Sequence, residues 1–161
     1  NWGGIPDDFP GAAKISDERL ICTKLTTVTG SLYASQSYAD KNGLPSGPAE
    51  FAGHSFVLFG SNPSPSRINN WLRERVDASQ IVSECSDVEG VITAIKAGLG
   101  IGPTPTSLAN DAGTLVRCFE PPQGTETSSW LVISPDAYRR PEVKAFSAFF
   151  APRFRAIFKA R

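Results

Sequence analysis

The 161-residue sequence predicts an α/β domain with a largely parallel sheet. Short runs rich in β-branched and aromatic residues, which favour strands, alternate along the chain with short helical patterns. The composition supports an ordinary buried core, because 40% of the residues are hydrophobic and 10% are aromatic. The expected strands lie at residues 20–25, 31–34, 55–60, 79–87, 114–119 and 128–135, and residues 99–105 are expected to form a short strand or an extended turn.

The clearest helix is expected to begin at Val88 and to end at Gly98. Its apolar residues recur at i, i+3, i+4 and i+7, and Asp87 stands where an N-cap is needed. Gly98 can adopt the left-handed conformation that ends a helix at no steric cost. Further helical segments are expected at residues 35–43, 49–52 and 106–113, and from Pro141 onward, where Pro152 should break or kink the helix.

Composition narrows the class of protein. No run approaches the roughly 18 apolar residues of a membrane span, and the start lacks the regions of a secretory signal, although an already cleaved secreted form stays open. Because the chain starts at Asn1 and contains no methionine, a fragment or processed product is expected. Cys22, Cys85 and Cys118 lack metal-ligand spacing and His54 is the one histidine, so no metal site is expected. Reduced cysteines in a soluble cytoplasmic protein are the favoured interpretation.

The C-terminal segment, residues 139–161, is basic and aromatic. Its basic residues are Arg139, Arg140, Lys144, Arg153, Arg155, Lys159 and Arg161, against one acidic residue, Glu142. Such a segment is compatible with contact to nucleic acid or to a partner. A solvated helix face is favoured instead, because five residues predict a buried stripe on the same helix: Phe146, Phe149, Phe150, Phe154 and Phe158.

Alternating glycines in TAIKAGLGIGPTP, at Gly98, Gly100 and Gly102, do not form a dinucleotide-binding motif. In that motif the glycines follow a strand and open a helix, whereas Gly98 follows a helix and Gly102 precedes Pro103, which has no amide hydrogen. No Walker-type sequence is present either. We therefore expect no nucleotide cofactor, and we expect Gly100 and Gly102 to let a short strand pass close to its neighbours.

The sequence gives little support for catalysis. A hydrolase would have to use His54, which stands between Gly53 and Ser55 at the start of a strand, where a structural role is more common. Binding is better supported. The segment SECSD ends a strand just before a helix, so Ser83, Cys85 and Ser86 could face a ligand at the helix N-terminus. The alternative, that Ser86 and Asp87 only cap the helix, has similar weight.

Several stretches together resemble the effector-binding domain of LysR-type transcriptional regulators. SLYASQSYADKNGLPSGPAEFAGH resembles the crossover strand and linker of that domain, and VEGVITAIKAGLGIGPTP resembles its Ala-Gly-x-Gly-Ile helix and strand. GTLVRCFEPP and SWLVISPDAYRRPEVKAFSAFFAPRF resemble its closing strands and final helix. The order and spacing agree from about residue 22 to residue 154.

The resemblance implies a two-lobed fold like that of periplasmic binding proteins. Residues 44–123 would form a complete second lobe, and residues 1–43 and 124–161 a partial first lobe with the two crossover strands. The family's winged helix-turn-helix and the beginning of its first lobe have no counterpart here. DNA would therefore be contacted only through a separate domain outside this chain. Thr104 also replaces a usually apolar residue.

The implied function is sensing of a small, commonly anionic effector between the lobes, with no enzymatic activity, cofactor, metal or membrane partner. A homo-oligomer stays open, and the alternative function is a stand-alone binding or oligomerising module. The expected ligand contacts are Ser31, Tyr33 and Ser35 on the first crossover, Phe59 or Ser61 after the next strand, Ser83, Cys85 and Ser86 at the helix N-terminus, and Ile101 and Pro103 on the adjacent wall.

Overall fold

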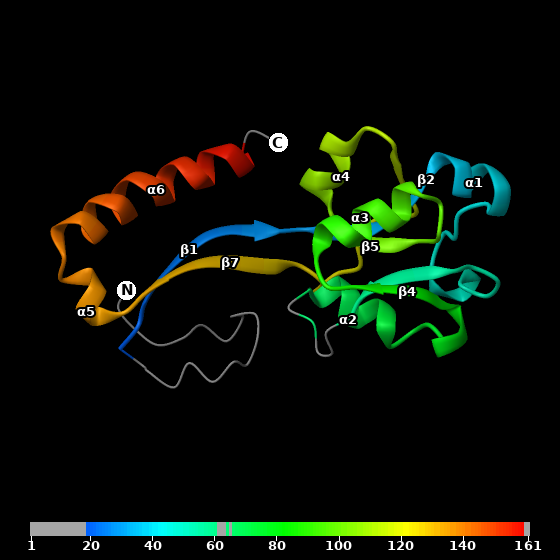
Figure 1. Ribbon diagram of the computed structural model, residues 1–161, viewed down its shortest axis with the longest axis horizontal. Coiled ribbons are helices and arrows are strands. Elements are labelled where there is room, and N and C mark those ends of the chain that lie inside the picture. The colour runs from blue at the N-terminus through cyan, green and yellow to red at the C-terminus, as the bar shows by residue number, and fades with distance from the viewer. Residues whose placement is uncertain (1–18, 61–63, 65, 160–161) are drawn as a thin grey trace. The chain divides into compact units, whose positions relative to one another are not determined.

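The structure, a computed structural model, describes residues 19–60, 64 and 66–159. The chain forms two compact units. Unit 1 comprises Asn1–Val28 and Thr127–Arg161, and unit 2 comprises Thr29–Glu126 (Figure 1). The sequence predicted lobe boundaries at residues 43 and 124. The two compact units instead meet at residues 28 and 127, so the predicted lobe boundaries stay a prediction.

The described part of unit 2 contains five strands in a mixed arrangement. β2 (Gly30–Ser35) pairs antiparallel with both β5 (Gly102–Pro105) and β6 (Leu115–Arg117). β3 (Phe56–Phe59) and β4 (Ile81–Cys85) pair parallel. A parallel bridge between Phe56 and Ile101 joins the two sets, with Val57 N donating to Ile101 O at 2.8 Å.

The expectation of a largely parallel sheet is therefore wrong for β2. Parallel neighbours require a crossover connection, which β3 and β4 have in the segment that contains α2 (Arg67–Arg73). β2 instead follows β1 (Ile21–Val28) after Thr29 alone, with no helix between them. β2 pairs with β5 and β6 rather than with β1, the strand before it, and it runs antiparallel to both.

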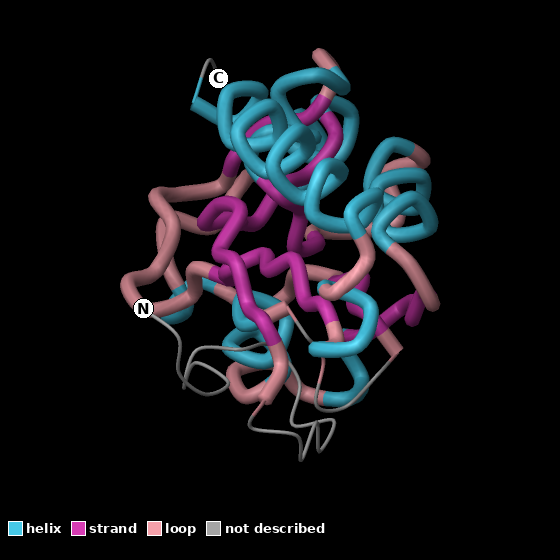
Figure 2. The backbone as a smooth tube through the Cα atoms, turned by 90° about the vertical axis from the view of Figure 1, so that its left-hand side faces the viewer, coloured by secondary structure: helices cyan, strands magenta, loops and turns pink. Residues whose placement is uncertain are grey.

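Short helices connect the strands of unit 2 (Figure 2). They are α1 (Gln36–Asn42), α2, α3 (Val88–Lys96) and α4 (Thr106–Ala112), with 3₁₀ turns at Pro48–Glu50 and Ala78–Gln80. Asp87 caps α3, since its side chain accepts from Gly90 N, and Gly98 follows the helix with a φ of 77°. Both ends of this helix are confirmed as predicted.

Alternating side chains of β3 place the core of unit 2 on two faces of the sheet. Phe56 and Leu58 pack on the α2 side, whereas Val57 packs on the α3 side. The α2 side also buries Leu72, and Trp71 packs against it half-buried. The remaining buried apolar residues of the two clusters are Leu32, Ala34, Tyr38, Phe51, Ile68, Ile101, Val91, Ala94 and Ile95.

Gly100 and Gly102 allow the close approach that the sequence predicted. A Cβ atom at Gly100 would lie 2.5 Å from Ser55 O, inside the distance that real contacts show. One at Gly102 would lie 2.9 Å from Ile95 Cδ1. The strand after α3 can therefore lie against β3 only because these positions lack side chains.

Unit 1 consists, in the described part of the chain, of a two-stranded ribbon and two helices. β1 pairs antiparallel with β7 (Thr127–Ile133), with an irregularity between Lys24 and Thr26. α5 (Pro135–Tyr138) leads into α6 (Pro141–Lys159), which lies along β1 (Figure 1). The Arg155 guanidinium donates twice to Lys24 O, at 3.1 and 2.6 Å, and ties the helix to the strand.

α6 differs from the sequence-based expectation in two ways. The helix continues through Pro152 to Lys159, so a break at Pro152 is wrong, and a kink there stays a prediction. The expected buried stripe is also wrong in part, because Phe146 is 53% exposed and Phe149 is 59% exposed. Phe150 and Phe154 are half-buried, and Phe150 stacks on Phe146 with ring centroids 5.1 Å apart. The helix period indicates which residues share a face but not whether anything covers that face.

Candidate functional site

Four chain segments meet at one edge of the unit 2 sheet. Because β3 and β4 are parallel, their carboxyl ends lie together, and Gly60 N donates to Cys85 O at 2.9 Å. β5 runs parallel to β3 and ends at this edge, where Gly30 and Ser31 of β2 pair with Pro105 and Thr104. We call this region the carboxyl edge and define it as Gly30, Ser31, Phe59, Gly60, Cys85, Ser86, Thr104 and Pro105.

α3 begins at the carboxyl edge, directly after Ser86. Asp87 Oδ1 accepts from Gly90 N at 2.7 Å, and Ser86 Oγ donates to Asp87 Oδ2 at 3.4 Å. The cap expected from the sequence is thus confirmed. Ser86 remains exposed, so it can support the cap and still meet solvent. Asp87 and Glu89 make the first turn of α3 acidic, which the helix dipole stabilises.

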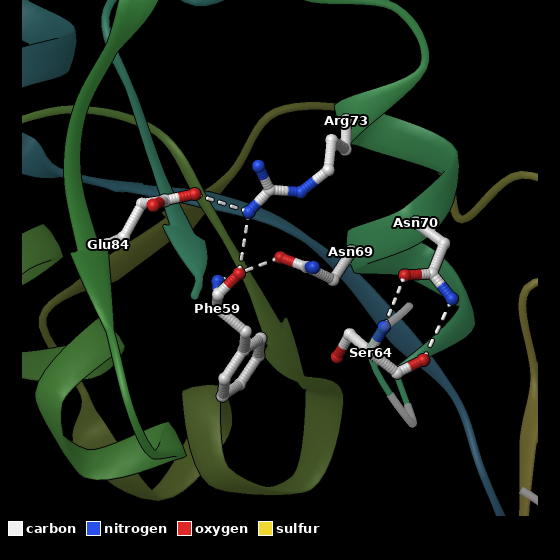
Figure 3. Close-up of polar contacts among 6 residues, drawn as sticks. All are labelled: Phe59, Ser64, Asn69, Asn70, Arg73 and Glu84. Carbon is white, nitrogen blue, oxygen red and sulfur yellow. Dashed lines mark hydrogen bonds and ion pairs between the residues drawn. The ribbon is translucent and has the colours of Figure 1, made fainter. Parts of the chain in front are cut away.

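Side chains of α2 hold the last residue of β3 (Figure 3). Asn69 Oδ1 accepts from Phe59 N at 2.9 Å, and Arg73 Nη2 donates to Phe59 O at 2.7 Å. The same guanidinium forms an ion pair with Glu84 of β4, at 2.5 Å. Both backbone groups of Phe59 are therefore satisfied, and the ends of β3 and β4 are linked through one arginine.

The sequence analysis did not identify this clamp. Asn69 and Arg73 stand four residues apart and so share a helix face, which was the available signal. Their partner Phe59, however, is ten residues away from Asn69, and periodicity does not reveal such a contact. Asn70 also forms two hydrogen bonds with the Ser64 backbone, each of 2.8 Å, which fix the start of α2 (Figure 3).

The structure brings several predicted contact residues together at the carboxyl edge. Ser31, Phe59, Cys85 and Ser86 all lie there. Ser83 lies two residues earlier on β4, with its Oγ 3.8 Å from Cys85 Sγ. Ser61 was also predicted, and it lies outside the described residues.

Other predicted residues lie away from this edge. Ser35 is at the opposite end of β2, about 13 Å from Ser31 along the strand, and caps α1 by accepting from Tyr38 N at 3.2 Å. Tyr33 is buried in the middle of β2. Ile101 forms the bridge at the start of β3, and Pro103 is fully buried in β5.

His54 has structural contacts at the end of the sheet opposite the carboxyl edge. Its Nδ1 lies 3.2 Å from the Tyr38 hydroxyl, which also accepts from Ser55 N at 3.0 Å, and Gln80 Nε2 donates to His54 O at 3.3 Å. These bonds join α1 to the loop before β3. His54 therefore has the contacts of a structural residue and not those of a catalytic base hydrogen-bonded to a nucleophile.

The three cysteines are free thiols. Burial raises the pKa of the Cys118 thiol to about 12, so the thiol stays protonated well above the ordinary thiol pKa of 9.0. Within the described residues, no cluster of three or more His, Cys, Asp and Glu side chains could hold a metal ion. None of the helices described is both long and apolar enough to cross a bilayer.

Comparison with known protein families identifies the chain. The family described as the LysR substrate binding domain matches residues 10–155. The chain belongs to this family. It is therefore an effector-binding domain of the LysR type, a family of transcription regulators and not of enzymes. A search of curated proteins finds no match.

Solved structures of LysR-type regulators share this mixed α/β fold, as resemblance in the sequence implied. The regulatory domain of CrgA from Neisseria meningitidis is 21% identical, with a TM-score of 0.69 over 89% of this chain and 72% of that one. The regulatory domain of AphB from Vibrio vulnificus is 18% identical, with a TM-score of 0.58 over 91% and 70%. The chain spans about half of full-length AphB from Vibrio cholerae, at 18% identity and a TM-score of 0.59.

Proposed function

We propose that this effector-binding domain binds a small molecule at the carboxyl edge of unit 2, between two lobes of a periplasmic-binding-protein-like fold. The observation that carries the proposal is the convergence of Ser31, Phe59, Cys85 and Ser86, from three strands and a helix start, on one edge. Open α/β sheets bind ligands beyond the carboxyl ends of their strands, where polar groups and helix N-termini gather.

In this proposal, the domain acts in the cytoplasm as part of a longer regulator. Effector binding closes the lobes, and the closure is transmitted to DNA through a separate domain that is not among these 161 residues. No cofactor or metal takes part. Tyr33, Ser35, Ile101 and Pro103 are proposed to shape the sheet behind the effector, because they are buried or cap a helix.

The two ends of α3 offer a matched test. Ser86→Trp places a bulky side chain at the carboxyl edge, and Ala97→Trp places the same side chain on the exposed C-cap at the other end. Small organic acids, amides and sugars are first screened by thermal shift, and calorimetry then measures the hits. We expect Ser86→Trp to abolish binding and Ala97→Trp to leave the affinity unchanged. Unchanged affinity in Ser86→Trp would exclude the edge as the binding site.

A second candidate function is a stand-alone module whose partial first lobe is covered by another copy of the chain. The exposed rings of Phe146 and Phe149 on α6 favour it, because adjacent exposed aromatic rings are typical of association surfaces. Solution mass across a range of protein concentrations tests this candidate. A strictly monomeric, well-folded species would count against it.

A further inference from the structure

Buried polar atoms without hydrogen-bond partners gather at the carboxyl edge. Among the residues that the structure describes, five such side-chain atoms occur: Asn69 Nδ2, Arg73 Nε, Thr104 Oγ1, Thr106 Oγ1 and Trp130 Nε1. The four in unit 2 all belong to side chains at the ends of β3 and β5. Unsatisfied buried groups are few in native proteins and destabilise the fold. Asn69 and Arg73 use their other polar atoms to hold Phe59, whereas the hydroxyl is the single polar group of the Thr104 side chain and it has no partner. A buried group of this kind points to a function that outweighs its cost.

Thr104 and Ser31 make the contrast clear, because they lie directly opposite each other on β5 and β2. Ser31 Oγ donates to Phe119 O at 2.9 Å, so its hydroxyl is satisfied. Thr104 is 1% exposed, and its hydroxyl has neither a protein partner nor access to solvent. Of these two neighbouring buried hydroxyls, that of Ser31 has a hydrogen-bond partner and that of Thr104 does not.

Thr104 lies on the α3 side of the sheet. Gly102 faces Ile95 of α3, and Thr104, two residues later on the same strand, projects to the same side. That side is apolar, with Val57 and Val91 in its core cluster. On this side of the sheet the unsatisfied Thr104 hydroxyl therefore lies next to an apolar cluster and opposite Ser31, whose hydroxyl is already bonded to Phe119 O.

Charges on this side do not favour an anion. The first turn of α3, which begins at the carboxyl edge, carries Asp87 and Glu89, whereas Lys96 lies in the last turn. Arg73 belongs to α2, on the opposite side of the sheet, and its charge is already paired with Glu84. A carboxylate ligand at the start of α3 would thus face like charge, which is unfavourable.

We propose that Thr104 is a specificity-determining residue of the effector site and that the effector is uncharged. It would have an apolar body and one hydrogen-bonding group, such as an amide, carbonyl or hydroxyl, that pairs with Thr104 Oγ1. This inference rests on the proposed function. It departs from the anionic effector that family resemblance suggests.

The first test measures thermal unfolding without ligand. Thr104→Val keeps the shape of the side chain and removes the unsatisfied hydroxyl, so the Tm should rise by about 3–6 °C. Ser31→Ala is the matched control, and it should lower the Tm because Phe119 O loses its donor. A lower Tm in Thr104→Val would show that the hydroxyl has a partner, and it would overturn the proposal.

The second test uses matched amides and carboxylates of butyric, cyclohexanecarboxylic and phenylacetic acid, measured by calorimetry. At least one amide should bind more tightly than its carboxylate, and Thr104→Val should weaken that binding about tenfold while Thr104→Ser retains it. The inference would be overturned if the carboxylates bind more tightly than the amides or if no amide binds. It would also be overturned if Thr104→Val leaves the amide affinity unchanged. Carboxylate binding that Ser86→Trp abolishes would still support the proposed function.

Discussion

Unit 2 and unit 1 both combine strands with helices, but they bury their side chains to different depths. Among the residues that the structure describes, the large side chains that are fully buried all belong to unit 2, for example Phe56, Leu72 and Ile95. In the described part of unit 1, Ala151 is the most buried apolar residue, at 5%, and a two-stranded ribbon is covered by one helix. A two-stranded ribbon alone is marginal in water. Unit 2 therefore supplies the stable frame for the proposed site.

The two units also differ in net charge. By the division at residues 28 and 127, unit 1 carries ten basic and six acidic residues, and unit 2 carries six basic and ten acidic residues. The zero net charge of the chain thus hides two units of opposite sign. The acidic balance of unit 2 agrees with an effector site that does not select anions.

The largest expected effect comes from the core of unit 2. Leu72→Ala should reduce the free energy of unfolding of unit 2 by about 2–5 kcal/mol, because a fully buried leucine is replaced by a cavity. Denaturant unfolding followed by fluorescence of the neighbouring Trp71 measures it. Leu99→Ala is the matched control, since Leu99 is exposed, and it should change stability by less than about 0.5 kcal/mol. Equal effects would contradict the assignment of the core.

An intermediate effect is expected from alkaline pH. Burial raises the pKa of Cys118 from its ordinary value of 9.0 to about 12, so the folded state retains the proton between these values. Unfolding then releases a proton, and stability falls as pH rises above 9. By about pH 10 the loss should be about 1 kcal/mol. Cys118→Ala should remove this part of the pH dependence, and parallel curves for both proteins would contradict it.

Local chemistry predicted part of the fold from the sequence. Asp87 and Gly98 bound α3 as expected, because capping and left-handed backbone depend on the residues themselves. The antiparallel direction of β2 was not predicted, because no short-range signal records how a strand enters a sheet. The Asn69 contact with Phe59 was missed for the same reason.

The candidate contact residues were selected from the sequence, and their role in binding an effector stays a prediction. Ser31, Phe59, Cys85 and Ser86 were selected by strand-end logic and resemblance, and the structure places them at one edge. The missing hydrogen-bond partner of Thr104 could not be foreseen from the sequence. Whether a side chain has a partner depends on which residues the complete fold brings next to it. The sequence indicates which side chains lie near the carboxyl edge. The packing of the whole fold decides which of their polar atoms lack a hydrogen-bond partner.

The smallest expected effect concerns the exposed face of α6. Phe149→Ser should change the free energy of unfolding by less than about 0.5 kcal/mol, because the ring is 59% exposed and gains little from burial. Phe154→Ser, at a half-buried position on the same helix, should cost more. Denaturant unfolding at two protein concentrations separates the outcomes. If Phe149→Ser costs more than about 1 kcal/mol at high concentration only, another copy covers α6, and unit 1 owes its stability to association. A large cost at both concentrations would mean that the ring is buried within the chain itself, which would contradict the contrast between the two units.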